Sequence, residues 1–163
     1  MKTCTTTVDG NIKAKNVKRV MPPTYFLLCI IGMGALYLLL PLAHVIIFPW
    51  NLGGVALIAA GIYMAAAASM AFGRVKTTVE PFEVSTALVT SGFFRISRNP
   101  MYLGFAIVLT GIAILMGVLS VFAVIPVFII LMEAIFIRVE EKMLEREFGE
   151  TWREYRRRTR RWL

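Results

Sequence analysis

The sequence predicts an all-α membrane protein with about four transmembrane helices and a C-terminal cytosolic amphipathic helix. Two observations lead to this fold class. Of the 163 residues, 58% are hydrophobic and only 17% are charged, whereas a soluble domain has about 25% charged residues. The apolar residues also gather in runs long enough to cross a bilayer, which takes roughly 20 residues. The length fits a single membrane domain over residues 1–163.

Four apolar runs follow a polar N-terminal tail that covers residues 1–21. The predicted spans are about residues 25–48, 54–72, 101–117 and 120–137. Pro41 would end or kink the first span, because proline lacks the N–H that a helix interior needs. The apolar stretch from Met101 to Ile137 is too long for one span, and Gly117 marks the expected hairpin within it.

The C-terminal segment, residues 138–163, has the pattern of an amphipathic helix. Apolar side chains recur at spacings of three to five residues, at Val139, Met143, Phe148, Trp152 and Tyr155. Such spacing places them on one stripe of a helix. We expect this helix to lie outside the bilayer, because charged residues fill its other positions.

The distribution of lysine and arginine predicts the orientation. These residues fall at 2–19, 74–98 and 138–161, and none lies in residues 41–54 or in the hairpin at Gly117. With four spans, all three basic stretches lie on one side of the membrane. Basic loops face the cytoplasm, so both termini are expected to be cytoplasmic.

Two other classes of function fit the sequence poorly. The net charge of +8 could indicate nucleic-acid binding, but membrane orientation accounts for the charge and no soluble module accompanies it. No metal site is expected, because the chain has one histidine, His44, and two differently placed cysteines, Cys4 and Cys29.

A first candidate functional segment, Arg98–Gly104, lies at the cytoplasmic mouth of the third span. Structural roles would suffice for it: Arg98 as an anchor, Pro100 at the first helical position, Tyr102 as an interfacial aromatic residue and Gly104 as a packing site. In a functional interpretation, the free N–H groups of the helix start, together with Arg98, bind an anion.

A second candidate group comprises Glu140, Glu141 and Leu144, where the fourth span leaves the membrane. The two acids could simply form a solvated face paired with nearby basic residues. Glu133 lies one to two turns inside the span, where a carboxylate needs a partner or a cavity. A structural hydrogen bond to a neighbouring helix would also explain Glu133. Helical spacing places Glu133, Ile137, Glu140 and Leu144 on one face.

The basic tail Tyr155–Leu163 has two interpretations. Attraction to anionic lipid headgroups contributes about 1 kcal/mol per basic residue. Binding of an anionic substrate or cofactor is the alternative.

Together these segments resemble the isoprenylcysteine carboxyl methyltransferase family, whose wider group includes phospholipid methyltransferases. The matching order is Arg98–Gly104, then Glu140-Glu141-Lys142-Met143-Leu144, then Phe148-Gly149 and Tyr155. Thr77-Thr78-Val79 and Leu88–Gly92 are similar to bacterial members, so a prokaryotic cell membrane is the expected location. Asn99 stands where eukaryotic carboxyl methyltransferases have histidine.

The resemblance implies S-adenosylmethionine as cofactor, held between the last two spans and the C-terminal helix. The expected cofactor-binding residues are Arg98, Asn99, Pro100, Tyr102, Gly104, Glu140, Glu141 and Leu144. The carboxylates that could act at the reacting centre are Glu133, Glu140 and Glu141.

The acceptor and the oligomeric state stay open at the level of sequence. A lipophilic small molecule is favoured over a prenylated protein, and O-, N- and S-methylation all fit. An NADPH-dependent membrane reductase of sterol-reductase-like architecture is one alternative function. A non-enzymatic membrane scaffold with a lipid-binding basic tail is another.

Overall fold

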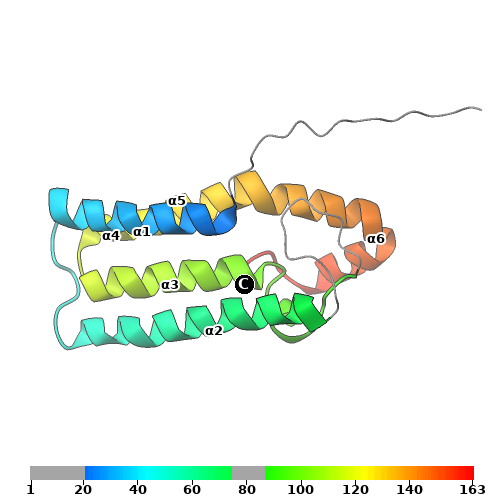
Figure 1. The fold of residues 1–163 in the computed structure, drawn as a ribbon, viewed down its shortest axis with the longest axis horizontal. Helices are drawn as coiled ribbons and strands as arrows, with labels where there is room; N and C mark the ends of the chain where they lie inside the picture. Colours follow the sequence, from blue (N-terminus) through cyan, green and yellow to red (C-terminus); the bar gives the residue numbers. More distant parts are fainter. Residues whose placement is uncertain (1–20, 75–86) are drawn as a thin grey trace, which may run out of the picture.

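The computed structural model describes residues 21–74 and 87–163, and four apolar helical segments run side by side in it (Figure 1). The helices are α1 (Pro22–Leu39), α2 (Gly53–Arg74), α3 (Pro100–Met116), α4 (Leu119–Phe122), α5 (Val124–Met132) and α6 (Arg138–Arg158). Three shorter helical segments complete them: η1 (Trp50–Leu52), η2 (Gly92–Arg95) and η3 (Glu133–Ile137). The described part of the chain contains no strand.

Length and composition allow three of the helical stretches to cross a membrane. These are Pro22–Leu39, Trp50–Gly73 and Leu119–Arg158, and Pro100–Met116 is a shorter apolar helix beside them. The predicted all-α membrane fold is therefore confirmed. The N-terminal tail up to residue 20 and the Thr77-Thr78-Val79 motif lie outside the described residues.

The first helix is shorter than the predicted span 25–48, because α1 ends at Leu39. Pro41 explains the end, since a residue that precedes proline is disfavoured in helical conformation. The backbone after Pro41 binds the hairpin at Gly117 instead. The N–H of Val45 donates to the Gly117 carbonyl at 2.8 Å, and that of Leu119 donates to the Ala43 carbonyl at 3.0 Å.

Gly117 forms the expected hairpin between α3 and α4. Its φ of 68° is left-handed, a conformation that glycine adopts without a steric penalty. A Cβ at this position would also lie 2.1 Å from the Ile46 carbonyl oxygen. Both constraints require glycine here, so the hairpin joins the last two apolar segments at the end of the molecule away from α6 (Figure 1).

Two pairs of glycines let α2 and α3 approach until their backbones touch. A Cβ on Gly104 would lie 2.7 Å from the Gly61 carbonyl oxygen, and a Cβ on Gly111 would lie 2.6 Å from that of Gly54. The pairs are seven residues apart on each helix, about two turns. Small residues at matching turns are typical of helices that pack in lipid.

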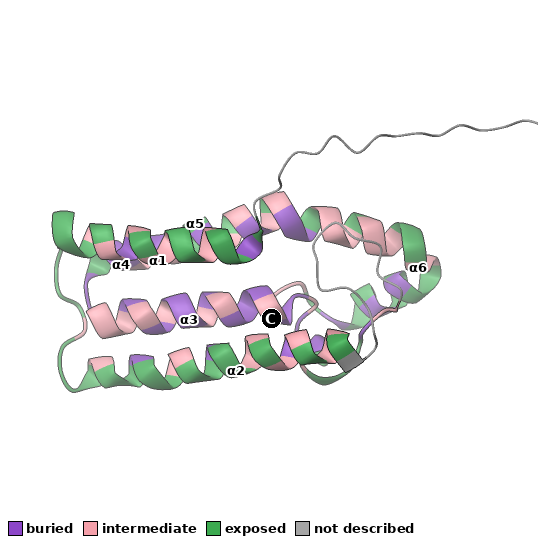
Figure 2. Cartoon of the chain, in the orientation of Figure 1, coloured by how far each residue is buried: buried purple, intermediate pink, exposed green. Residues whose placement is uncertain are grey.

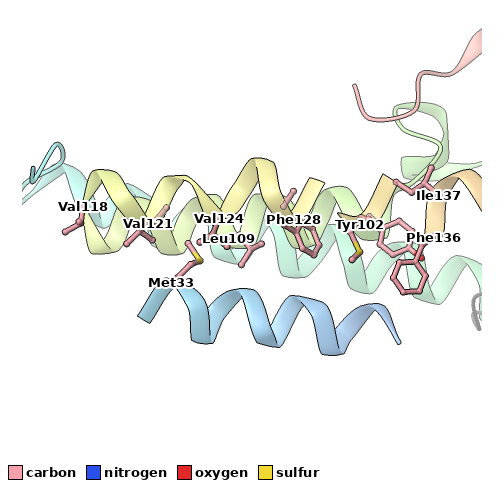
Figure 3. Packing of buried hydrophobic residues seen from close by; sticks show 12 residues of the cluster. Met33, Tyr102, Leu109, Val118, Val121, Val124, Phe128, Phe136 and Ile137 are labelled. Atoms are coloured by element: carbon pink, nitrogen blue, oxygen red, sulfur yellow. The ribbon is translucent and has the colours of Figure 1, made fainter. Parts of the chain in front are cut away.

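The core lies between α1, α3, α4 and α5, and the outer helix faces are apolar too. Figure 3 shows its side chains, which include Met33, Leu109, Val121 and Phe128, and all four are fully buried. Other large apolar side chains, such as those of Leu28 in α1 and Ile62 in α2, are exposed. Figure 2 shows exposed residues along both α1 and α2. This arrangement suits a protein whose outer surface contacts lipid rather than water.

The longest helical stretch, Leu119–Arg158, forms much of the polar end of the bundle. From Leu119 the chain continues through α5 and η3 into α6, which bends at Gly149, where φ is 51°. The last residues then return to the start of α3 (Figure 1). An isolated bridge between Ser97 and Arg160 joins these two segments.

Candidate functional site

The returning C-terminal segment, residues 159–163, forms a C-terminal strap across the start of α3. Its main-chain carbonyls accept hydrogen bonds from the residues that precede α3. The Arg98 N–H donates to Arg160 at 2.9 Å, and the Ser97 Oγ and Asn99 Nδ2 each donate to Arg161 at 3.1 Å. Ser97 Oγ also accepts the Asn99 N–H. These bonds fix the backbone just before Pro100 opens α3.

Side chains from these two segments, from η3 and from α6 form a chain of alternating charges. Glu141 receives Arg98 Nη2 at 3.2 Å and two donors of Arg161, Nε at 3.1 Å and Nη2 at 2.6 Å. Arg161 Nη1 reaches Glu133 at 2.9 Å, and Arg138 Nη2 reaches the same carboxylate at 3.2 Å. We call these five residues the ion-pair chain. It joins the start of α3, the π turn η3, α6 and the strap.

Arg98 is the most deeply placed cation of the ion-pair chain. Its side chain is 8% exposed and that of Glu141 is 12% exposed. Burial lowers the pKa of Arg98, and the Glu141 carboxylate acts in the opposite direction. The hydrogen bonds to Glu141 raise the pKa of Arg161. Arginine ionises far above neutral pH, so both remain cations.

Two donors of Arg98 are left over in this arrangement. Its Nε and Nη1 are buried and have no hydrogen-bond partner within the residues that the structure describes. The guanidinium carbon lies 5.7 Å from the centroid of the Trp152 ring. A buried donor without a partner costs free energy. An anionic ligand that accepts hydrogen bonds from these two Arg98 donors would remove that cost.

An aromatic layer lies beside the ion-pair chain. The Tyr102 hydroxyl donates to Glu140 Oε1 at 2.7 Å. The Tyr102 ring centroid is 6.3 Å from that of Phe136, which is in turn 5.6 Å from that of Tyr25 in α1. Tyr102 and Phe136 belong to the buried apolar core, so Glu140 connects the polar end to that core.

The face predicted for Glu133, Ile137, Glu140 and Leu144 is wrong, because η3 is a π-helical turn. A π turn holds about one more residue than an α turn and rotates the next helical residues by roughly 100°. Glu133 therefore shares Arg161 with Glu141, eight positions on, while Glu140 turns to Tyr102.

The structure brings together most of the predicted site residues. Arg98, Asn99, Tyr102, Glu133, Glu140 and Glu141 lie in the ion-pair chain or are bonded beside it. Pro100 is buried at the first turn of α3. Gly104 contacts Gly61 of α2 instead, and Leu144 is half-buried on α6.

The apolar stripe of α6 packs against the residues around η2. Trp152 and Tyr155 are buried, and the Tyr155 hydroxyl donates to the Phe94 carbonyl at 2.7 Å. A cavity of about 430 Å³ opens beside it, between η2 and the end of α6. The lining residues are Thr90, Arg95, Thr151, Glu154, Tyr155, Arg158 and Thr159. Sequence reasoning did not anticipate this cavity.

Arg161 is the functional candidate that sequence reasoning missed. The tail is so rich in arginine that no pattern separates Arg161 from its neighbours. Arg153, Arg157 and Arg158 pair instead with exposed glutamates of α6. Only the return of the strap to α3 distinguishes Arg161, and this return is a property of the tertiary structure.

Comparison with known proteins identifies the family. The sequence matches the profile described as phospholipid methyltransferase over residues 50–151. The chain belongs to the phospholipid methyltransferase family. The resemblance inferred from the Arg98–Gly104 and Glu140–Leu144 segments is thus confirmed. A search of curated proteins found no match.

The fold of this phospholipid methyltransferase family member also resembles a solved structure. It is the eukaryotic intramembrane Ras methyltransferase ICMT (isoprenylcysteine carboxyl methyltransferase), at a TM-score of 0.65 and 22% identity. The match covers 86% of this chain and 52% of that one. The chain therefore spans about half the length of that methyltransferase and shares its fold.

Proposed function

We propose that this chain transfers the methyl group of S-adenosylmethionine to a lipophilic acceptor at the cytosolic face of the membrane. One observation carries the proposal: Arg98 is buried beside Glu141 at the polar end of an apolar bundle, and two of its donors have no partner among the described residues. Membership of the phospholipid methyltransferase family supports methyl transfer. The one-sided basic residues support the cytosolic orientation.

The residues present suit this cofactor. Its carboxylate matches Nε and Nη1 of Arg98, which lack a partner in the part of the chain that the structure describes, and the start of α3 at Pro100 adds positive potential. Its ammonium group matches Glu141, since a carboxylate offers about four acceptor positions and the arginines use three. Asn99 holds the strap in place. Gly104 contributes by packing α3 against α2, and Leu144 by apolar surface.

Bound S-adenosylmethionine supplies an activated methyl group that a nucleophile displaces in line. The protein then has to position the reactants and exclude water. Glu140 is the proposed carboxylate at the reacting centre, because its Oε1 lies beside the aromatic layer of Tyr102 and Phe136. It would accept the proton of an amine or thiol acceptor, whereas a carboxylate acceptor needs no base.

Glu133 and Glu141 have a different proposed part from Glu140. Both are bonded to Arg161, and each contacts a further arginine. We assign them to holding charge in place rather than to proton transfer. Of the three carboxylates that the sequence offers for the reacting centre, we therefore retain Glu140 alone.

The acceptor is proposed to be lipophilic because the bundle surface is apolar. Exposed side chains such as Leu28, Ile31 and Ile62 line the outer helix faces. A lipid-like or isoprenylcysteine-like molecule could reach the polar end sideways from the bilayer. Anionic headgroups are proposed partners of the arginines of α6, although several of these already pair with glutamates.

Binding and transfer measurements test the proposal. Purified full-length protein in lipid nanodiscs should bind S-adenosylmethionine, and Arg98→Ala and Glu141→Gln should abolish the binding. Labelled cofactor should then methylate a component of membrane lipid extract or a small isoprenoid thiol or acid. Binding of NADPH in its place would favour the reductase alternative, and unchanged function in Glu140→Ala and Glu141→Ala would favour the scaffold.

A further inference from the structure

We propose that Arg161 is a positioning residue that keeps Arg98 available for the carboxylate of the bound cofactor. The inference rests on the proposed function and adds a role for the C-terminal strap. It starts from the way in which two arginines share Glu141. Arg161 engages both carboxylate oxygens, whereas Arg98 contacts Oε1 through Nη2 alone.

This unequal sharing decides how much of Arg98 remains free. A guanidinium and a carboxylate prefer a fork with two parallel hydrogen bonds. Arg161 forms that fork with Glu141, so Arg98 is restricted to one contact. The Nε and Nη1 of Arg98 are thereby left buried and without a partner among the described residues.

Loss of the Arg161 side chain should reverse this division. Glu141 would then be free to form the two-bond fork with Arg98, its nearest remaining cation. The fork would consume a donor that the cofactor carboxylate needs. Glu133 would still have Arg138 as a partner. The expected defect is therefore specific for ligands that carry a carboxylate.

The strap itself should survive the substitution, because main-chain atoms and a neighbouring side chain hold it. The carbonyls of Arg160 and Arg161 accept three hydrogen bonds, which do not depend on the Arg161 side chain. Trp162 packs against the apolar core. An effect of the Arg161 side chain can thus be separated from loss of the strap.

The experiment compares two thioether nucleosides, of which only one carries an amino-acid group. S-adenosylhomocysteine carries the carboxylate and ammonium groups, and methylthioadenosine lacks both. Their dissociation constants are measured by calorimetry on full-length protein in nanodiscs. In Arg161→Gln, S-adenosylhomocysteine should bind at least about tenfold more weakly, the equivalent of one charge-assisted hydrogen bond. Methylthioadenosine should bind as before, and Arg161→Lys should restore part of the loss.

Arg157→Gln is the matched control. It removes the same charge from the same basic tail, but its side chain is 73% exposed and pairs with Glu150. Both ligands should bind this variant as they bind the wild type. Equal weakening of both ligands in Arg161→Gln would mean a purely structural role, and unchanged binding of both would mean no role; either result overturns the inference. If the wild type binds neither ligand, the proposed function fails and the inference falls with it.

Discussion

α2 and α3 meet through glycines that leave no space between their backbones, whereas the start of α3 and the C-terminal strap are joined by charged side chains. The contact between α2 and α3 requires that its glycines carry no Cβ, so adding one methyl group disturbs it. The second contact depends on matched charges, and removing one charge changes how the remaining charges pair. The two contacts of α3 are therefore sensitive to opposite kinds of substitution, and variants in each region test that contrast.

The largest effect is expected from Glu141→Ala. Arg98 and Arg161 would lose their common partner, and Arg98 is 8% exposed. Breaking a buried ion pair costs about 3–5 kcal/mol, so the free energy of unfolding in nanodiscs should fall by about 3 kcal/mol. Glu145→Ala is the control, because its partners Arg153 and Arg156 are more than half exposed. Equal losses in the two variants would contradict the buried role of Glu141.

A smaller loss is expected from Gly61→Ala. The added Cβ would lie 2.6 Å from the Gly104 carbonyl oxygen, which is backbone and cannot move aside alone. Overpacking costs about 1–3 kcal/mol, and thermal unfolding in nanodiscs should shift to lower temperature accordingly. Gly73→Ala lies on the same helix, and no described atom beyond its chain neighbours and its own helix backbone would come within 4 Å of the new Cβ; it should leave the transition unchanged or raise it. An unshifted Gly61→Ala would show that α2 and α3 can separate freely.

Tyr102→Phe should have an intermediate effect that links the two regions. It removes the hydroxyl that donates to Glu140 and keeps the ring beside Phe136. A hydrogen bond to a charged group contributes about 1.5 kcal/mol or more, so both unfolding free energy and methyl-transfer rate should fall. Tyr63→Phe, whose ring is exposed, is the comparison. A transfer rate that stays at the wild-type level would remove Glu140 from the reacting centre.

The smallest effect is expected from Arg157→Gln on stability. Arg157 and Glu150 are 73% and 69% exposed, and such surface pairs contribute less than about 1 kcal/mol. Denaturation of this variant should match the wild type, and raising the salt concentration should shift both alike, because salt screens exposed charges. A loss as large as that of Glu141→Ala would mean that the whole tail, rather than Arg161, stabilises the polar end.

Much of the fold depends on local chemistry and could be predicted. Hydropathy predicts the four apolar segments, and Gly117 predicts the hairpin. The apolar stripe through Trp152 and Tyr155 predicts the amphipathic helix. Pro41 predicts an end or a kink of the first helix, and α1 ends just before it. These features depend on residues that are close in sequence.

The candidate site could be predicted only in part. The segments at Arg98 and Glu141 were expected to meet, and they do. No sequence pattern predicts the π turn at η3. Because of this turn, Glu141 rather than Glu140 lies on the same helix face as Glu133. The pairing of Arg161 depends on the bend at Gly149 and the return of the strap. Both are properties of tertiary packing.

The length of α3 has a consequence for the surrounding lipid. Its 17 residues extend about 25 Å at about 1.5 Å per residue, against a hydrocarbon thickness of about 30 Å. A bilayer accommodates a short span by thinning around it. The headgroup layer would then dip toward Arg98 and Glu141 at the start of α3, so the proposed lipid-borne acceptor would travel a shorter way out of the hydrocarbon to reach these residues.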